Sequence, residues 1–212
     1  MKRILCFGDS NTWGYIPEGN GARYDENTRW TQLMQKALGS DFAVIEEGHN
    51  GRTTVFFDPF EYRMAGIDYF YPCIVSQSPL DLIILMLGSN DLKARFSVTA
   101  PDIADGFDRY HAALKTANLH GSDPKVLLVA PAEMDPAYHH HPSFSTVFGP
   151  DADKRSKGFA EAYRKTAEKH GWSFLDAALY AKASPLDGLH LDAEAHRSLA
   201  GAITAKVRKL LK

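Results

Sequence analysis

Five short apolar runs, several of them rich in β-branched residues, recur along the chain and predict buried strands. Each run is hydrophobic at successive positions instead of alternating with polar residues, which is typical of parallel strands covered on both faces. The runs span residues 3–8, 42–46, 80–88, 125–131 and 172–176.

The segments between these runs have apolar residues at helical spacing. Residues 29–38 show this spacing, a second helix is expected to begin at Pro101, and a third to end at Gly171. A last helix is predicted from Asp192, a favourable N-cap, and its Lys- and Arg-rich end suits the helix dipole. Strands that alternate with helices predict a doubly wound α/β sheet with right-handed crossovers. No linker, repeat or low-complexity segment divides the sequence, so we expect a single domain over residues 1–212.

Two long connections, 51–77 and 132–153, follow strands and should project from the carboxyl edge of the sheet. Ligands of open α/β sheets bind at that edge, where the strand order reverses. In a flavodoxin-like order 2-1-3-4-5, the first and third strands are neighbours across this switch point. Functional residues are therefore expected directly after the strands.

The first strand is followed by Gly-Asp-Ser-Asn at residues 8–11. A serine on a tight turn after a buried strand can hold its Oγ clear of the backbone, where it is open to attack an acyl carbon. On this motif alone, a serine that only caps a helix is the commoner outcome. The turn lacks both the GxxxxGK[ST] and the GxGxxG patterns, so it does not predict a phosphate-binding loop.

Two further motifs offer donors for an oxyanion. Gly51 lies in Gly-His-Asn-Gly-Arg-Thr-Thr after the second strand, and its N–H can approach a ligand closely. Asn90 lies in Gly-Ser-Asn-Asp after the third strand, and its carboxamide donates hydrogen bonds without carrying a charge. Considered alone, Gly51 is more often a plain turn glycine, and the Asn-Asp pair of the second motif also favours turns for purely local reasons.

The fourth motif, Asp187-Gly188-Leu189-His190, precedes the last helix. A carboxylate three residues before a histidine can bind the imidazole Nδ1–H, which leaves Nε2 as a base directed toward Ser10. A lone surface histidine is the alternative. Two other histidines, His49 and His196, are rival bases, but neither has this spacing from a carboxylate. Two other aspartates are rival acids: helix capping explains Asp192, and hydrogen bonds to backbone amides of the Ser10 turn explain Asp9.

The ends of parallel strands meet at one edge, so these four motifs should converge on an acyl-transfer site. Together they resemble the four blocks of the SGNH (GDSL) hydrolase superfamily over the whole chain. Residues 5–10, 45–48, 52–54 and 86–91 are similar to bacterial arylesterases of the acyltransferase or perhydrolase type. The resemblance implies a three-layer α/β/α fold with a five-stranded parallel sheet, and a serine esterase that needs no metal or other cofactor.

The resemblance also assigns roles by position. Ser10 is the expected nucleophile, His190 the base and then acid, and Asp187 its orienting carboxylate; the Ser10 and Gly51 N–H groups and the Asn90 side chain form the oxyanion hole. Asn11 departs from the pattern, because the family name expects Leu there, and it adjoins the wall of the acyl pocket. Homo-oligomer formation is expected by family analogy.

Several other residues have a functional and a structural interpretation. Trp13 and Tyr15 either line the acyl pocket or pack in the core, and Arg52 either contacts substrate or bonds a nearby loop. His139-His140-His141 suggests a metal site, but consecutive ligands rarely share one ion, so a loop rim over the site is favoured. Seven of the 24 aromatic residues fall between residues 56 and 71: Phe56, Phe57, Phe60, Tyr62, Tyr69, Phe70 and Tyr71. This stretch is interpreted as local core, as a wall of the pocket mouth or as a subunit interface, because aromatic residues are enriched in all three.

Composition narrows the class of protein. The formal net charge of −2 argues against a nucleic-acid-binding protein, and no apolar run approaches the ~18 residues of a membrane span. A cytoplasmic protein with a reduced, buried Cys6 is expected.

We predict a serine esterase for short-chain acyl or aryl esters, with acyl transfer to an alcohol or peroxide competing with hydrolysis. A carbohydrate acetylesterase is the main alternative, and a non-catalytic flavodoxin-like binding module a distant one.

Overall fold

The fold is a five-stranded parallel sheet in the order β2-β1-β3-β4-β5, as predicted. The computed structural model describes residues 1–61 and 65–212, so Tyr62 lies outside the described residues. The strands are β1 Lys2–Gly8, β2 Phe42–Gly48, β3 Leu82–Met86, β4 Lys125–Ala130 and β5 Ser173–Asp176. The predicted third strand is shortened at both ends, and at its carboxyl end Gly88 leaves the extended conformation, with a φ of 124°.

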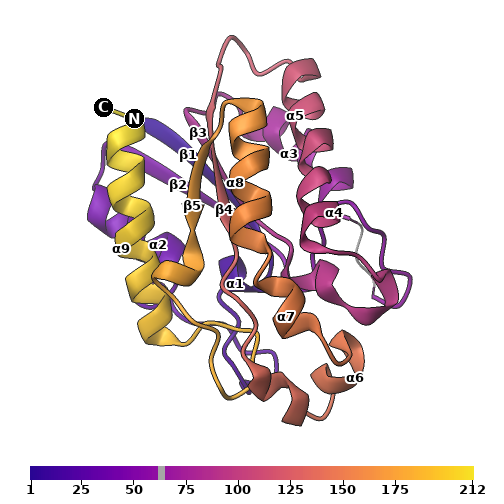
Figure 1. Ribbon diagram of the computed structural model, residues 1–212. Helices are drawn as coiled ribbons and strands as arrows, with labels where there is room; N and C mark the ends of the chain where they lie inside the picture. Colours follow the sequence, from indigo (N-terminus) through magenta and orange to yellow (C-terminus); the bar gives the residue numbers. More distant parts are fainter. Residues whose placement is uncertain (62–64) are drawn as a thin grey trace.

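Successive side chains of the strands enter two separate cores, one on each face of the sheet. Leu5 and Ile83 pack on one face, whereas Ile4, Cys6 and Leu82 pack on the other. The first core also contains side chains from four helices: α3 Gly66–Gln77, α4 Ala100–Asp105, α5 Phe107–Thr116 and α8 Phe159–His170. The second core contains side chains from α2 Trp30–Leu38 and α9 Ala193–Leu210 (Figure 1). The arrangement confirms the three-layer α/β/α fold and explains why the strands lack polar alternation.

The expected helices form, with one difference. Asp192 caps α9 by accepting a hydrogen bond of 2.8 Å from the Ala195 N–H, as predicted. The helix expected from Pro101 is divided into α4 and α5, because the Gly106 N–H bonds to Ile103 O in a tighter turn. Both halves still direct their apolar side chains into the same core.

The two long connections contain helices that the sequence pattern did not predict. The connection 51–77 ends in α3, which forms although Pro72 lies inside it, because burial of Phe70, Cys73 and Ile74 compensates for the missing backbone donor. The connection 132–153 contains the 3₁₀ helix Pro136–His140 and α6 Phe144–Phe148, and it leads into α7 Ala152–Ser156.

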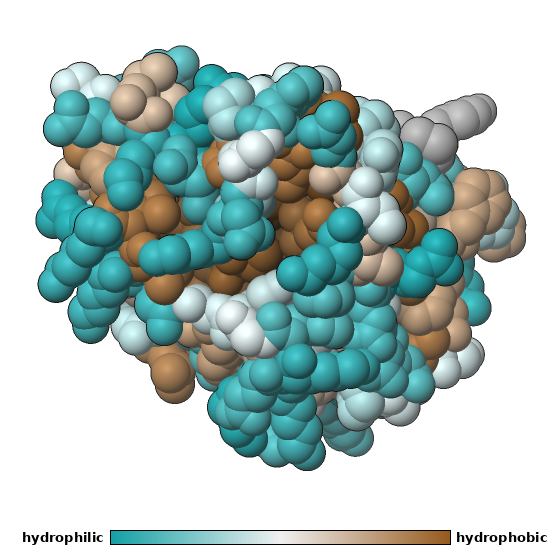
Figure 2. Space-filling model, turned by 90° about the horizontal axis from the view of Figure 1, so that it is seen from above, coloured by the Kyte–Doolittle hydropathy of each residue, from teal (hydrophilic) through white to brown (hydrophobic). Residues whose placement is uncertain are grey.

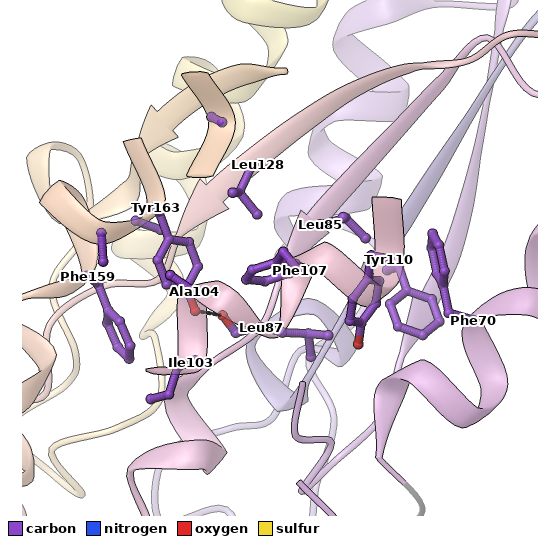
Figure 3. Close-up of a cluster of buried hydrophobic side chains, with 14 of the residues drawn as sticks. Phe70, Leu85, Leu87, Ile103, Ala104, Phe107, Tyr110, Leu128, Phe159 and Tyr163 are labelled. Atoms are coloured by element: carbon purple, nitrogen blue, oxygen red, sulfur yellow. Dashed lines mark hydrogen bonds between the residues drawn. The ribbon is translucent and has the colours of Figure 1, made fainter. Parts of the chain in front are cut away.

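Buried aromatic side chains anchor the carboxyl edge of the sheet (Figure 3). The Tyr163 hydroxyl donates a hydrogen bond of 2.7 Å to Leu87 O, directly after β3. The Tyr110 hydroxyl donates one of 3.0 Å to Thr54 O, in the connection after β2. Phe107 lies between them, with ring centroids 5.2 Å from Tyr163 and 5.3 Å from Tyr110. These contacts fix two of the loops that the sequence places at the site.

The opposite edge of the sheet holds both chain termini (Figure 1), and the Lys2 ammonium donates a hydrogen bond to Leu211 O. Figure 2 shows this end, where apolar side chains lie in a hollow between hydrophilic ones. A cavity of about 510 Å³ at this edge is lined in part by His111, Lys125 and Trp172. Within the described ranges, no helix has the length and apolar character needed to cross a membrane.

Candidate active site

Ser10 lies at the start of the short helix α1 Ser10–Trp13, directly after β1. Asp9, not Ser10, is the N-cap: its carboxylate accepts a hydrogen bond of 2.9 Å from the Asn11 N–H, as its turn-forming interpretation predicts. Burial raises the pKa of Asp9 to about 7, against the opposing effect of that hydrogen bond. The capping function is therefore carried by Asp9, and the Ser10 hydroxyl is left to bond elsewhere.

His190 bonds both Ser10 and Asp187. Its Nε2 lies 2.9 Å from Ser10 Oγ, and its Nδ1 lies 2.7 Å from Asp187 Oδ2. All three side chains are at least 95% buried. Burial raises the pKa of Asp187, but hydrogen bonds from the His190 ring and from the His190 and Leu189 N–H groups outweigh it, so this pKa lies below its ordinary value. Asp187 therefore stays ionised, which fixes Nδ1 as a donor and leaves Nε2 able to accept the Ser10 proton.

The expected oxyanion donors lie at the same edge. Gly51 has a φ of 78°, a conformation that glycine adopts without strain. Over residues 1–61 and 65–212, no acceptor binds the backbone N–H of Ser10 or of Gly51. The Asn90 carboxamide donates one hydrogen bond of 3.2 Å to Arg52 O, which leaves its second N–H for another acceptor.

The turn that presents Asn90 depends on Gly88. Its φ of 124° disfavours any residue with a side chain, and a Cβ there would lie 2.1 Å from the Tyr163 hydroxyl. Asn90 itself belongs to the 3₁₀ helix Ser89–Leu92. The neighbouring Asp91 carboxylate accepts hydrogen bonds from the Thr54 N–H at 2.8 Å and from the Thr54 hydroxyl at 2.6 Å. The loops after β2 and β3 are thereby held together.

Arg52 has the structural role that its sequence left open. Its guanidinium donates hydrogen bonds to Gly8 O at 2.9 Å and to Glu47 O, and its Cζ lies 4.1 Å from the centroid of the Phe7 ring. The side chain is buried, and burial lowers the pKa of this guanidinium. Arg52 thus ties the loop that carries Gly51 to the ends of β1 and β2.

The three residues expected at the substrate pocket differ in their contacts. The Tyr15 ring stacks on the His190 ring, with centroids 4.3 Å apart and planes at 27°. Trp13 lies one step further away, 6.3 Å from the Tyr15 ring, and carries the Arg23 guanidinium over its face. The Asn11 side chain bonds the backbone on both sides of His190.

Phe144 is a site residue that sequence reasoning missed. Its ring centroid lies 5.9 Å from that of His190, and His141 stacks on it at 4.1 Å. The only available signal was its position in a long connection expected at the carboxyl edge.

The three consecutive histidines do not converge on one point. His141 Nε2 lies 3.2 Å from a Glu18 carboxylate oxygen, and His139 Nε2 lies 3.6 Å from Asp153. In the part of the chain that the structure describes, no three His, Cys, Asp or Glu side chains are placed to hold a metal ion. Through its contact with Phe144, His141 lies near His190, whereas the rim over the site that the sequence favours stays a prediction.

The rival histidines are engaged elsewhere. His196 lies on α9, where its Nδ1 accepts a hydrogen bond of 3.4 Å from the Trp30 N–H, and burial lowers its pKa to about 4. His49 Nδ1 lies 3.0 Å from Asn50 O. Of the three histidines, His190 is the one whose Nε2 accepts a hydrogen bond from the Ser10 hydroxyl.

The aromatic stretch 56–71 does not act as one unit. Phe70 is fully buried in the core, whereas Phe57 and Phe60 are 64% and 78% exposed. Tyr69 and Tyr71 are also partly exposed. The core interpretation therefore applies to Phe70 and does not apply to Phe57 or Phe60.

The comparisons with known proteins agree with this geometry. A model of the GDSL-like lipase/acylhydrolase family matches residues 6–198. The chain belongs to this family. A search of curated proteins gave no match.

Two solved structures of similar proteins cover the full length of the chain. An aryl esterase from M. smegmatis is 38% identical, with a TM-score of 0.93, over 99% of this chain and 100% of that one. A carbohydrate acetylesterase from Sinorhizobium meliloti is 37% identical, with a TM-score of 0.92, over the same shares. This member of the GDSL-like family is accordingly a carboxylic ester hydrolase.

Proposed function

We propose that the protein is a serine esterase that hydrolyses short-chain acyl or aryl esters through an acyl-enzyme on Ser10. The hydrogen-bonded chain from Ser10 Oγ through His190 to Asp187, with distances of 2.9 Å and 2.7 Å, is the observation that carries the proposal. A serine hydroxyl is a weak nucleophile unless a base removes its proton, and this arrangement supplies that base.

In the acylation step, His190 Nε2 takes the Ser10 proton while Oγ attacks the ester carbonyl carbon. The carbonyl electrons move onto oxygen, and the Ser10 and Gly51 N–H groups and the Asn90 carboxamide stabilise that charge. When the intermediate collapses, the C–O bond to the leaving alcohol or phenol breaks and His190 returns the proton to it. Ionised Asp187 stabilises the imidazolium during both transfers.

Deacylation repeats these steps with water as the nucleophile. His190 removes a proton from water, the hydroxide oxygen bonds to the acyl carbon, and Ser10 Oγ leaves with the proton from His190. An alcohol or peroxide that takes the place of water would give acyl transfer, which we retain as a proposed competing reaction.

The surroundings of His190 support an aryl or other apolar ester. Tyr15 stacks on this imidazole, and Phe144 lies near it from another loop. Aromatic rings favour offset or edge contacts with an aromatic leaving group. The similarity to an acetylesterase from Sinorhizobium meliloti supports acetylated sugars as the second candidate substrate class. Family membership argues against the non-catalytic binding module.

Rates on phenyl acetate and on acetylated xylose test the proposal and separate its two substrate classes. We expect the higher kcat/KM on phenyl acetate, and loss of both activities in Ser10→Ala. Higher kcat/KM on acetylated xylose would favour the carbohydrate acetylesterase. Retention of esterase activity in Ser10→Ala would contradict the assigned nucleophile.

We further propose that residues 1–212 form one domain, that the enzyme is cytoplasmic, and that it assembles as a homo-oligomer. The sheet that runs between both cores supports the single domain. The exposed rings of Phe57 and Phe60 support an interface, since aromatic residues are enriched there. Size-exclusion chromatography with light scattering tests the assembly: a monomer at micromolar concentration would contradict it.

A further inference from the structure

Asn11, the residue after the proposed nucleophile, bonds the backbone on both sides of His190. Its Nδ2 donates a hydrogen bond of 3.3 Å to Leu189 O, and its Oδ1 accepts one of 3.0 Å from the Leu191 N–H. The side chain is 95% buried. Both functional groups of the carboxamide are thus used, and they bracket the proposed general base.

The Asn11 backbone is fixed as well. Its N–H donates to the Asp9 carboxylate at 2.9 Å, and its carbonyl accepts a hydrogen bond of 3.2 Å from Trp30 Nε1, on a fully buried ring. Asn11 is therefore a rigid point from which the loop that carries His190 is held.

The Asp187–His190 loop already has its own internal hydrogen bonds. Asp187 Oδ1 accepts from the Leu189 and His190 N–H groups, and Oδ2 contacts the imidazole. These bonds keep the carboxylate on the imidazole, but they do not place the imidazole over Ser10. Across the described parts of residues 9–13 and 187–191, the hydrogen bonds between the two segments are those of Asn11 and the Ser10–His190 pair itself.

We propose that Asn11 is a positioning residue that sets the distance between His190 and Ser10, an inference that rests on the proposed catalytic roles of these two residues. A leucine, which the family name places at this position, has similar size but makes neither hydrogen bond. Asn11 thus makes two directional hydrogen bonds where a leucine would only pack. Such positioning matters for the rate, because a displacement of about 1 Å at a reacting pair can lower it about 10²-fold.

Asn11→Leu tests the proposal against a matched control, Thr12→Val. Thr12 is the next residue of the same helix, is fully buried, and its Oγ1 has no hydrogen-bond partner among the described residues. Both variants replace a buried polar group by an apolar one of similar shape, but only Asn11→Leu removes hydrogen bonds to the loop that carries His190.

We expect Asn11→Leu to lower kcat on phenyl acetate about 10- to 100-fold with KM within about twofold of wild type. The rate at which a phosphonate labels Ser10 should fall by a similar factor. The pH midpoint of kcat/KM should stay unchanged, because the Asp187–His190 pair remains intact. Thr12→Val should keep wild-type kcat and labelling rate.

Wild-type kcat and labelling in Asn11→Leu would overturn the proposal, as would an equal loss in Thr12→Val. A rise in KM alone would assign Asn11 to substrate binding instead. If Asn11→Leu does not fold, the smaller polar variant Asn11→Ser serves, and wild-type kcat in it overturns the proposal. A different result tests the proposed function: it fails if the phosphonate does not label Ser10 in the wild-type enzyme at all.

Discussion

His190 Nε2 lies 2.9 Å from Ser10 Oγ although 180 residues separate the two along the chain. Ser10 follows the first strand and His190 precedes the last helix, so the contact exists only in the folded sheet. Because Asp187 holds the other imidazole nitrogen, the proton on Ser10 has a defined acceptor.

Asp187→Asn should lower kcat about 10⁴-fold near neutral pH, because an amide can present its NH₂ group to Nδ1 and stabilise the wrong tautomer of His190. Steady-state kinetics on phenyl acetate give the measurement. Asp192→Asn is the matched control: it lies two residues after His190, and asparagine caps a helix as well as aspartate does. Equal losses in both variants would show that the effect does not come from the His190 carboxylate.

Asn90→Ala should lower kcat about 10²- to 10³-fold and leave KM nearly unchanged, since an oxyanion donor acts on charge that develops in the transition state. The same change at Asn118, which is exposed in the connection between α5 and β4, should have no effect. An Asn90 effect confined to KM would contradict its role as an oxyanion donor.

Asp9→Asn should change how stability depends on pH. Burial raises the pKa of Asp9 from 3.8 to about 7, so the folded protein binds a proton that the unfolded chain releases between these values. The protonated carboxyl favours folding at low pH, and this advantage is lost as pH rises toward 7 and above. The free energy of unfolding of wild type, measured with urea, should therefore fall relative to that of Asp9→Asn between pH 4 and 8, by up to about 4 kcal/mol. If the difference in the free energy of unfolding between wild type and Asp9→Asn does not change with pH, the raised pKa of Asp9 is contradicted. Asp41→Asn is the control: Asp41 is exposed, so the difference between this variant and wild type should stay constant with pH.

Phe144→Ala should lower kcat/KM on phenyl acetate more than on ethyl acetate, by about 5- to 10-fold, if the ring near His190 contacts an aromatic leaving group. Both esters deliver the same acetyl group, so the ratio of their rates isolates the leaving group. A uniform loss on both esters would assign Phe144 to the packing of His190 instead.

Local patterns were sufficient to predict the strands and the motifs that meet at the candidate site. The apolar runs identify strands that are buried on both faces, and parallel order brings Ser10, Gly51 and Asn90 to one edge because each follows a strand. The Asp187–His190 pair is close in sequence, so its spacing was informative.

Features that depend on distant contacts could not be read from the sequence. The helix α3 contains Pro72 and forms because Phe70 and Ile74 are buried against elements far away in the chain. The partners of Asn11 lie 178 and 180 residues away, so nothing near Asn11 indicated that it would bracket His190. Phe144 reaches the same imidazole from a loop whose path has no sequence signal.

The most direct test of the central claim is the mass of peptides from enzyme treated with an activated phosphonate ester. We predict one covalent adduct, on the peptide that contains Ser10, formed by displacement of the leaving group by Oγ and absent from Ser10→Ala. An adduct on a different residue, or none in active wild-type enzyme, would contradict the assignment of Ser10 as the nucleophile.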